Sequence, residues 1–136
     1  MITPNIPEAE TLTGLAIDGP AAMRAAARAL RKMGARAVVI KGGHPFALGE
    51  DANASSAVDL LYDGRSFTEF AARRIAGGGA HGTGCAFSAA VTARLARGED
   101  LEAAVRGAKT FVTRALRARF VLGEHGRPLL DHFAGR

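Results

Sequence analysis

The sequence predicts an α/β fold with a small sheet and about four helices, and three observations carry this prediction. A helix-like stretch that ends in a glycine is followed at once by the apolar run "AVVI" at residues 37–40. Two further strand-like runs flank the dipeptide Asp63-Gly64, and a glycine-rich segment then leads into two alanine-rich helical stretches. Because so few strands would leave a sheet edge uncovered, we expect the 136 residues to form a single, partial domain, the second half of a larger fold.

The N-terminal part is predicted to be an extended entry followed by two helices. Pro4 favours extended backbone in the residue before it, and residues 7–14 read as a short helix that Gly14 stops. Residues 18–34 form a stronger helical pattern, in which Asp18 is the expected cap.

The strands are predicted next. The continuous apolar run at residues 37–40 is typical of a strand covered on both faces. Residues 44–57 are polar and small, and are expected to form a loop. Residues 58–75 then contain two strand-like runs around Asp63-Gly64, and this dipeptide is a strong signal for an antiparallel hairpin.

Two helices are predicted after the glycine-rich segment. The first spans about residues 84–96, and Gly98 stops it. The second lies within residues 99–119, with acidic residues at its start and arginines at its end, as the helix dipole favours. The tail, residues 120–136, is expected to be irregular.

Composition limits the classes of partner. The net charge is +5, but the arginines are interleaved with alanines along helices and aromatic residues are few, which favours solvated helix faces over a nucleic-acid surface. No apolar run approaches the roughly 18 residues of a membrane span. The single cysteine excludes an internal disulfide and fits a reducing compartment, so we expect a cytoplasmic protein without nucleic-acid or membrane partners.

The glycine-rich segment before the third helix predicts an anion site. Glycines let a ligand approach the main chain, and a helix start offers unpaired N–H groups and a positive dipole end. The expected donors are the amides of Gly82, Thr83, Gly84 and Cys85. Because no lysine follows the last glycine, the segment is not a Walker A loop. A simple glycine-rich turn remains the alternative.

Cys85, the only cysteine, has two interpretations. In the first turn of a helix the thiolate form is favoured, so Cys85 could act as a nucleophile or a proton acceptor. It could equally be a small buried side chain. His81 lies four residues earlier, but no further ligands stand at the spacing of a zinc motif, and zinc is not expected.

Two other positions suggest phosphate chemistry. Asn5, Glu8 and Glu10 surround the start of the first helix, where acidic residues usually complement the helix dipole but could also hold Mg²⁺ through water. Lys41 directly follows the buried strand, at the end where α/β folds bind ligands.

These segments together resemble the hydroxymethylpyrimidine/phosphomethylpyrimidine kinases of thiamine biosynthesis, within the ribokinase-like superfamily. The resemblance runs in order along nearly the whole chain, and its most specific part is His-Gly-Thr-Gly-Cys followed by an alanine-rich helix. The matching segments are "TPNIPEAETLTG", "GARAVVIKGGH", "DLLYDG", "HGTGCAFSAAVTARLARG" and "AVRGAKTFVTRAL". The resemblance implies a three-layer α/β/α fold, with one or two parallel strands plus a hairpin in this half.

The resemblance also implies roles for the residues singled out above. Residues 82–85 would form the anion hole for the transferring phosphoryl group, and Cys85 would take the proton of the substrate hydroxyl. Asn5 and Glu8 would help to position Mg²⁺. The residues implied in ATP binding are Lys41 and Gly43 at the phosphates and, at the adenine, Val105, Ala108 and Phe111.

The implied activity is ATP-dependent phosphorylation of hydroxymethylpyrimidine and then of its monophosphate. The partner is a small pyrimidine, and the full-length family is expected to form homodimers. Because family members are about twice as long, we expect this chain alone to be inactive or weak. The alternatives are a pyridoxal kinase-type member and a non-catalytic phosphate-binding fragment that needs an N-terminal partner.

Overall fold

A computed structural model describes residues 1–43, 56–76, 80–123 and 126–135. Most of the loop predicted at residues 44–57, and the glycines at 77–79, lie outside the described residues. The chain divides into two compact units, residues 1–74 and residues 75–136, and each is described by itself.

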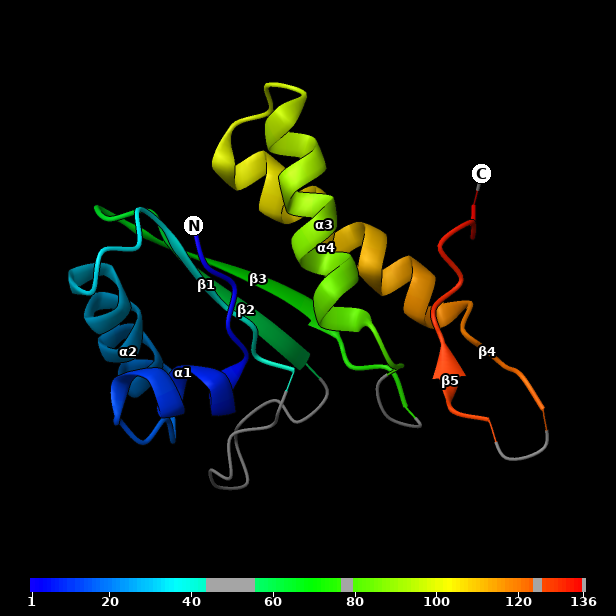
Figure 1. Ribbon diagram of the computed structural model, residues 1–136, viewed down its shortest axis with the longest axis horizontal. Coiled ribbons are helices and arrows are strands. Elements are labelled where there is room, and N and C mark those ends of the chain that lie inside the picture. The colour runs from blue at the N-terminus through cyan, green and yellow to red at the C-terminus, as the bar shows by residue number, and fades with distance from the viewer. Residues whose placement is uncertain (44–55, 77–79, 124–125, 136) are drawn as a thin grey trace. The chain divides into compact units, whose positions relative to one another are not determined.

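The first unit contains two helices and a three-stranded sheet (Figure 1). The sheet has the order β1-β2-β3 with antiparallel neighbours, and Ile40 of β1 lies opposite Leu60 of β2. The predicted hairpin is confirmed, because β2 and β3 pair along their whole length around the turn that contains Asp63 and Gly64. The elements are α1 (Ile6–Thr13), α2 (Pro20–Lys32), β1 (Val38–Ile40), β2 (Ser56–Tyr62) and β3 (Phe67–Arg73).

The extended N-terminal segment adds parallel pairing to β1. Ile2 forms a parallel bridge with Val38, and Asn5 forms another with Lys41. The Ile2 amide donates to the carbonyl of Ala37 at 3.1 Å, and the Lys41 amide donates to the carbonyl of Pro4 at 2.8 Å. The predicted extended entry is therefore confirmed, and it places Asn5 beside the residue that follows β1.

The core of the first unit lies between the two helices and one face of the sheet. Val38 and Ile40, two residues apart on β1, share that face with Leu60 of β2. The helices α1 and α2 contribute alanines and larger apolar residues to the same cluster, namely Ile6, Ala9, Met23, Ala26, Ala27 and Leu30. Alanines on α2 let the helix approach the sheet closely.

The helix caps of the first unit follow the sequence in one case and differ in the other. Gly14 ends α1 with φ of 70°, the left-handed conformation that glycine adopts without strain. At α2 the predicted Asp18 cap is wrong: the N-cap is Gly19, and no side chain bonds to the helix start. Because Pro20 occupies the first helical position, residue 19 becomes the cap and Asp18 lies one residue too early.

The second unit contains two long helices and a short ribbon (Figure 1): α3 (Thr83–Ala96), α4 (Leu101–Arg117), β4 (Phe120–Val121) and β5 (Pro128–Leu129). Both predicted helices are confirmed, and α3 packs against α4. Arg94 of α3 passes over Gly107 of α4 and forms an ion pair with Glu99 at 2.8 Å. The prediction of an irregular tail is wrong, because β4 and β5 pair as antiparallel strands. In the parts of the chain that the structure describes, every helix is too short or too polar to cross a bilayer.

Candidate functional site

The start of α3 is set by a glycine in the left-handed conformation. Gly82 has φ of 85° and is the N-cap, and its carbonyl accepts the Ala86 amide at 2.8 Å. Thr83 bonds back to Ala80, whose carbonyl accepts the hydroxyl of Thr83 at 2.6 Å and its amide at 3.4 Å. A side chain at position 82 would be strained, so the sequence Gly-Thr-Gly builds this turn locally.

The first turn of α3 leaves amide donors available for an anion. A helix cannot pair its first amides internally. Among the described residues, no acceptor bonds the amides of Gly84 and Cys85, which follow Thr83 in the helix. The sequence predicted amide donors at positions 82–85. Among the described residues, the Thr83 amide is the one of this stretch that already has an acceptor, the carbonyl of Ala80.

Cys85 lies on the surface of the first turn of α3. The cysteine is free and its side chain is exposed, so the interpretation as a small buried side chain does not hold. An exposed thiol at a helix start can meet a substrate. The role of Cys85 as a proton acceptor stays a prediction.

The backbone of His81 pairs with the C-terminal strand β5. Its amide donates to the carbonyl of Pro128 at 3.1 Å, and it forms a parallel bridge with Leu129. No group of three or more His, Cys, Asp or Glu side chains suited to a metal ion occurs within the described ranges.

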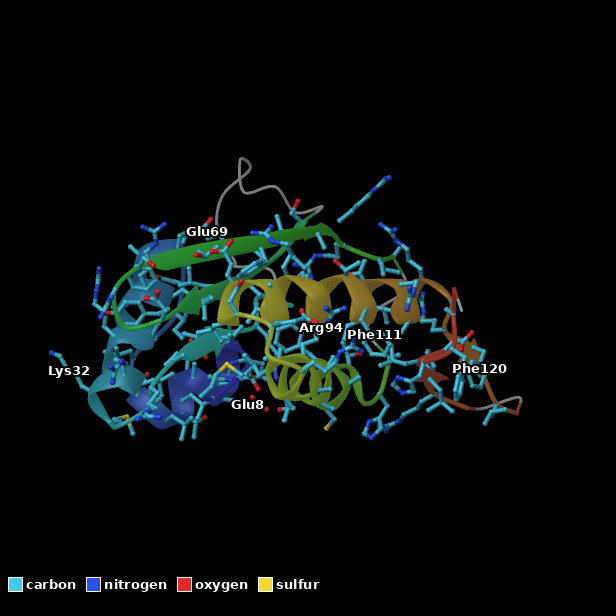
Figure 2. The ribbon with its side chains drawn as sticks, turned by 90° about the horizontal axis from the view of Figure 1, so that it is seen from above. Glu8, Lys32, Glu69, Arg94, Phe111 and Phe120 are labelled. Carbon is cyan, nitrogen blue, oxygen red and sulfur yellow. The ribbon has the colours of Figure 1, made fainter. Side chains whose placement is uncertain are left out.

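Asn5 and Glu8 form a capping box at the start of α1. Glu8 is labelled in Figure 2. The Glu8 amide donates to Asn5 Oδ1 at 2.8 Å, and the Asn5 amide donates to Glu8 Oε2 at 2.7 Å. Capping was one of the two interpretations of these residues. Glu8 is exposed and its Oε1 is not used by the box, so one carboxylate oxygen remains for a hydrated cation.

The segment Lys41-Gly42-Gly43 follows β1, and its middle residue packs closely against β2. Lys41 is half-buried, and Gly42 lies so close to β2 that an added Cβ would be 1.8 Å from the carbonyl oxygen of Val58. The Gly42 amide donates to Asp59 Oδ1 at 3.0 Å, and Asp59 is only 5% exposed. Position 42 therefore has no room for a side chain, because the backbone of β2 occupies that space.

Arg74, which directly follows β3, bonds the backbone after β1 and at the start of β2. It donates to the carbonyl of Gly43 at 2.6 Å and to that of Ser56 at 3.3 Å. Sequence reasoning missed Arg74 and Asp59. A carboxylate among apolar residues in "VDLLY" was the one available signal, because a buried charge needs partners.

The residues expected at the adenine lie on α4. Val105 and Ala108 are fully buried, whereas Phe111 is half-buried and stacks on His132 with 6.1 Å between ring centroids. Of these three residues, Phe111 alone keeps exposed surface.

The expected site residues thus fall into two groups. Asn5, Glu8, Lys41 and Gly43 belong to the first unit, where the bridge between Asn5 and Lys41 brings two of them side by side. Residues 82–85 and the three residues of α4 belong to the second unit, on two helices that pack together.

Comparison with known proteins gives a consistent family. A family model described as phosphomethylpyrimidine kinase matches residues 1–130. The hydroxymethylpyrimidine/phosphomethylpyrimidine kinase of Haemophilus influenzae is 48% identical over 134 residues, which are 98% of this chain and 48% of that protein.

Two solved structures extend the likeness to the fold. The ADP complex of Bacillus subtilis pyridoxal kinase has a TM-score of 0.84 and 37% identity, covering 98% of this chain and 49% of the other. The pyridoxal kinase of Staphylococcus aureus in complex with AMP-PCP and pyridoxal also has a TM-score of 0.84, with 34% identity over 98% of this chain and 47% of the other.

These likenesses confirm the family and the ribokinase-like α/β fold expected from the sequence. The chain spans about half the length of the Haemophilus influenzae relative and of both solved kinases. With a family match over residues 1–130, the chain belongs to the phosphomethylpyrimidine kinase family.

Proposed function

We propose that this chain carries the phosphate-binding part of an ATP-dependent kinase that phosphorylates hydroxymethylpyrimidine and its monophosphate. The observation that carries the proposal is the start of α3, where left-handed Gly82 precedes the amides of Gly84 and Cys85, which no acceptor among the described residues bonds. Such amides suit an anionic phosphoryl group. The names of the relatives supply the substrate class, and the nucleotide complexes of the solved pyridoxal kinases support ATP as the donor.

The amides at the start of α3 would stabilise charge during the transfer. ATP, when bound, supplies the γ-phosphoryl group. Donors fixed before the reaction need no reorganisation when charge develops on the equatorial oxygens, and phosphoryl transfer depends mostly on such positioning. The exposed Cys85 side chain would accept the proton of the substrate hydroxyl. Gly82 and Thr83 would shape the turn.

Residues of the first unit would hold the remaining charges. Half-buried Lys41 would contact ATP phosphates, with Gly43 offering close backbone approach. Mg²⁺ keeps several waters and binds through one or two carboxylates, and the Glu8 oxygen that the capping box leaves unused fits such water-mediated binding. Asn5 would then act by fixing Glu8. The adenine would lie against α4 near Phe111, with Val105 and Ala108 shaping the helix from within the core.

A pyridoxal kinase activity is the second candidate. It is favoured by the solved pyridoxal kinases, which match nearly all of this chain at 34–37% identity. The pyrimidine is preferred because the matching family model and the Haemophilus influenzae relative both bear that name.

The exposed cysteine fits a reducing compartment, so the proposal places the protein in the cytoplasm. A homodimer is also proposed for the full-length family, and sedimentation of a full-length member measures it.

The test separates nucleotide binding from transfer. Amide NMR signals of Gly84 and Cys85 are expected to shift when ADP is added to the purified chain. Phosphoryl transfer to hydroxymethylpyrimidine and to pyridoxal is then measured with and without an added N-terminal half of the Haemophilus influenzae relative. We expect transfer to the pyrimidine only in the complemented sample. Normal rates from this chain alone would contradict the expectation that it needs a complement.

Variants at Cys85 test the proton acceptor in the complemented sample. Cys85→Ala is expected to lower the transfer rate by about 10²–10⁴-fold with ADP affinity unchanged. Cys85→Asp, which restores a proton acceptor, is expected to retain transfer. A structural cysteine would instead give a stability loss alone in both variants. If neither ADP nor AMP-PCP, an ATP analogue that keeps the γ-phosphate, changes the amide signals of Gly84 and Cys85, the phosphate-binding function is wrong.

A further inference from the structure

The chain after α4 returns to the turn that begins α3. The amide of His81 donates to the carbonyl of Pro128 at 3.1 Å, and His81 bridges Leu129 in parallel. Leu129 also pairs with Phe120 across the β4-β5 ribbon. The residue directly before Gly82 is thus bonded to the C-terminal strand.

Apolar packing fixes the same turn from the side. Ala80, Ala115 and Leu130 form a buried cluster, and Leu130 is only 5% exposed. Ala80 is the residue whose carbonyl accepts both the hydroxyl and the amide of Thr83. The Asp131 amide donates to the Ala115 carbonyl at 3.2 Å, which anchors the tail on α4. The position of Ala80, and with it the start of α3, therefore depends on Leu130.

Arg119 provides a second link to the same region. Its guanidinium donates to the carbonyl of Ala76 at 2.7 Å and to that of Leu116 at 3.2 Å. One side chain thus joins the last turn of α4 to the backbone at residue 76. We use the name C-terminal brace for the residues that make these links, namely Arg119 and residues 128–130.

We propose that Leu130 and Arg119 are positioning residues for the phosphate-binding amides of Gly84 and Cys85. The inference rests on the proposed function of the α3 start. Those amides can stabilise a phosphoryl group only when they point to one place, and a displacement of about 1 Å in such a site is costly. Neither positioning residue needs to touch the ligand, since each acts on the backbone before Gly82.

The experiment uses ADP as the probe and the whole chain as the protein. Leu130→Ala is expected to speed hydrogen exchange of the His81 amide at least tenfold and to weaken ADP binding, followed at the Gly84 and Cys85 signals, about five- to tenfold. Leu130→Met, which conserves volume, is expected to restore both. The matched control is Leu122→Ala in the same tail, which removes the same atoms from a residue that is 65% exposed, and neither readout should change.

A second variant keeps the inference testable if Leu130→Ala does not fold. Arg119→Ala removes the link to Ala76 from a half-buried position, and about threefold weaker ADP binding is expected with unchanged exchange at the centre of α4. Wild-type ADP affinity in every variant that folds would overturn the positioning role. AMP-PCP replaces ADP as the probe if ADP alone gives no response. If neither nucleotide gives a response in the wild-type chain, the proposed function is contradicted instead. Hydrogen exchange of the His81 amide in Leu130→Ala or, if that variant does not fold, in Arg119→Ala then decides whether the C-terminal brace holds the turn.

Discussion

Replacing Gly42 by alanine is expected to destabilise the protein far more than the same change at its neighbour Gly43. Gly42 is buried beside β2, and an added Cβ would lie 1.8 Å from the carbonyl oxygen and 2.9 Å from the carbonyl carbon of Val58. At Gly43, which is exposed, no atom of the residues that the structure describes lies within 4 Å of the added atom. The pair changes the same atoms at adjacent positions, so Gly43→Ala is a matched control.

The magnitude follows from the distance that the backbone would have to move. Real Cβ atoms essentially never come within 3.0 Å of such an atom, so the two backbones must separate by at least 1.2 Å, the difference between 3.0 and 1.8 Å. Overpacking of this kind costs about 3 kcal/mol. The movement also weakens the bond from the Gly42 amide to buried Asp59, which adds about 1 kcal/mol. Gly43→Ala is expected to change the free energy of unfolding by less than about 1 kcal/mol.

Thermal and urea unfolding followed by circular dichroism measure both variants. Gly42→Ala is expected to lower the midpoint temperature by roughly 14 °C, whereas Gly43→Ala should stay within a few degrees of the wild type. Equal midpoints for the two alanine variants would refute the reasoning, because they would mean that β2 yields to the extra carbon at little cost.

Two smaller effects are expected in the same unit. Asn5→Ala removes the side-chain acceptor of the capping box and should cost about 1 kcal/mol in urea unfolding, and a neutral result would mean that α1 does not need its cap. Backbone bonds from Ser66 and Arg65 lower the pKa of Asp63, so its contribution to stability is complete above about pH 4 and is lost as the pH falls through the lowered value. The stability difference between wild type and Asp63→Asn should therefore shrink toward about pH 2, and a constant difference across that range would contradict it.

Local sequence signals predicted most of the elements. Gly14 ends α1 and Asp63-Gly64 lies in the hairpin turn as expected, because such residues act through their own backbone conformation. The wrong predictions concern features whose structure depends on a neighbouring residue or strand. Asp18 lost the cap of α2 to Gly19 through the position of Pro20, and β5 forms in a tail without a strand pattern because its partners are β4 and His81.

The sequence by itself determined the family, through motifs that follow in order along nearly the whole chain. It also determined the helices and the glycine turn before α3, since these depend on residues that are close along the chain. The tertiary structure alone decided that Cys85 is exposed, that Gly42 has no room for a side chain, and that Leu130 holds the turn before Gly82. These properties depend on contacts between residues that are distant in sequence, such as Leu130 and Ala80. Burial and close approach arise from packing, and no local pattern records which distant side chain will fill a given space.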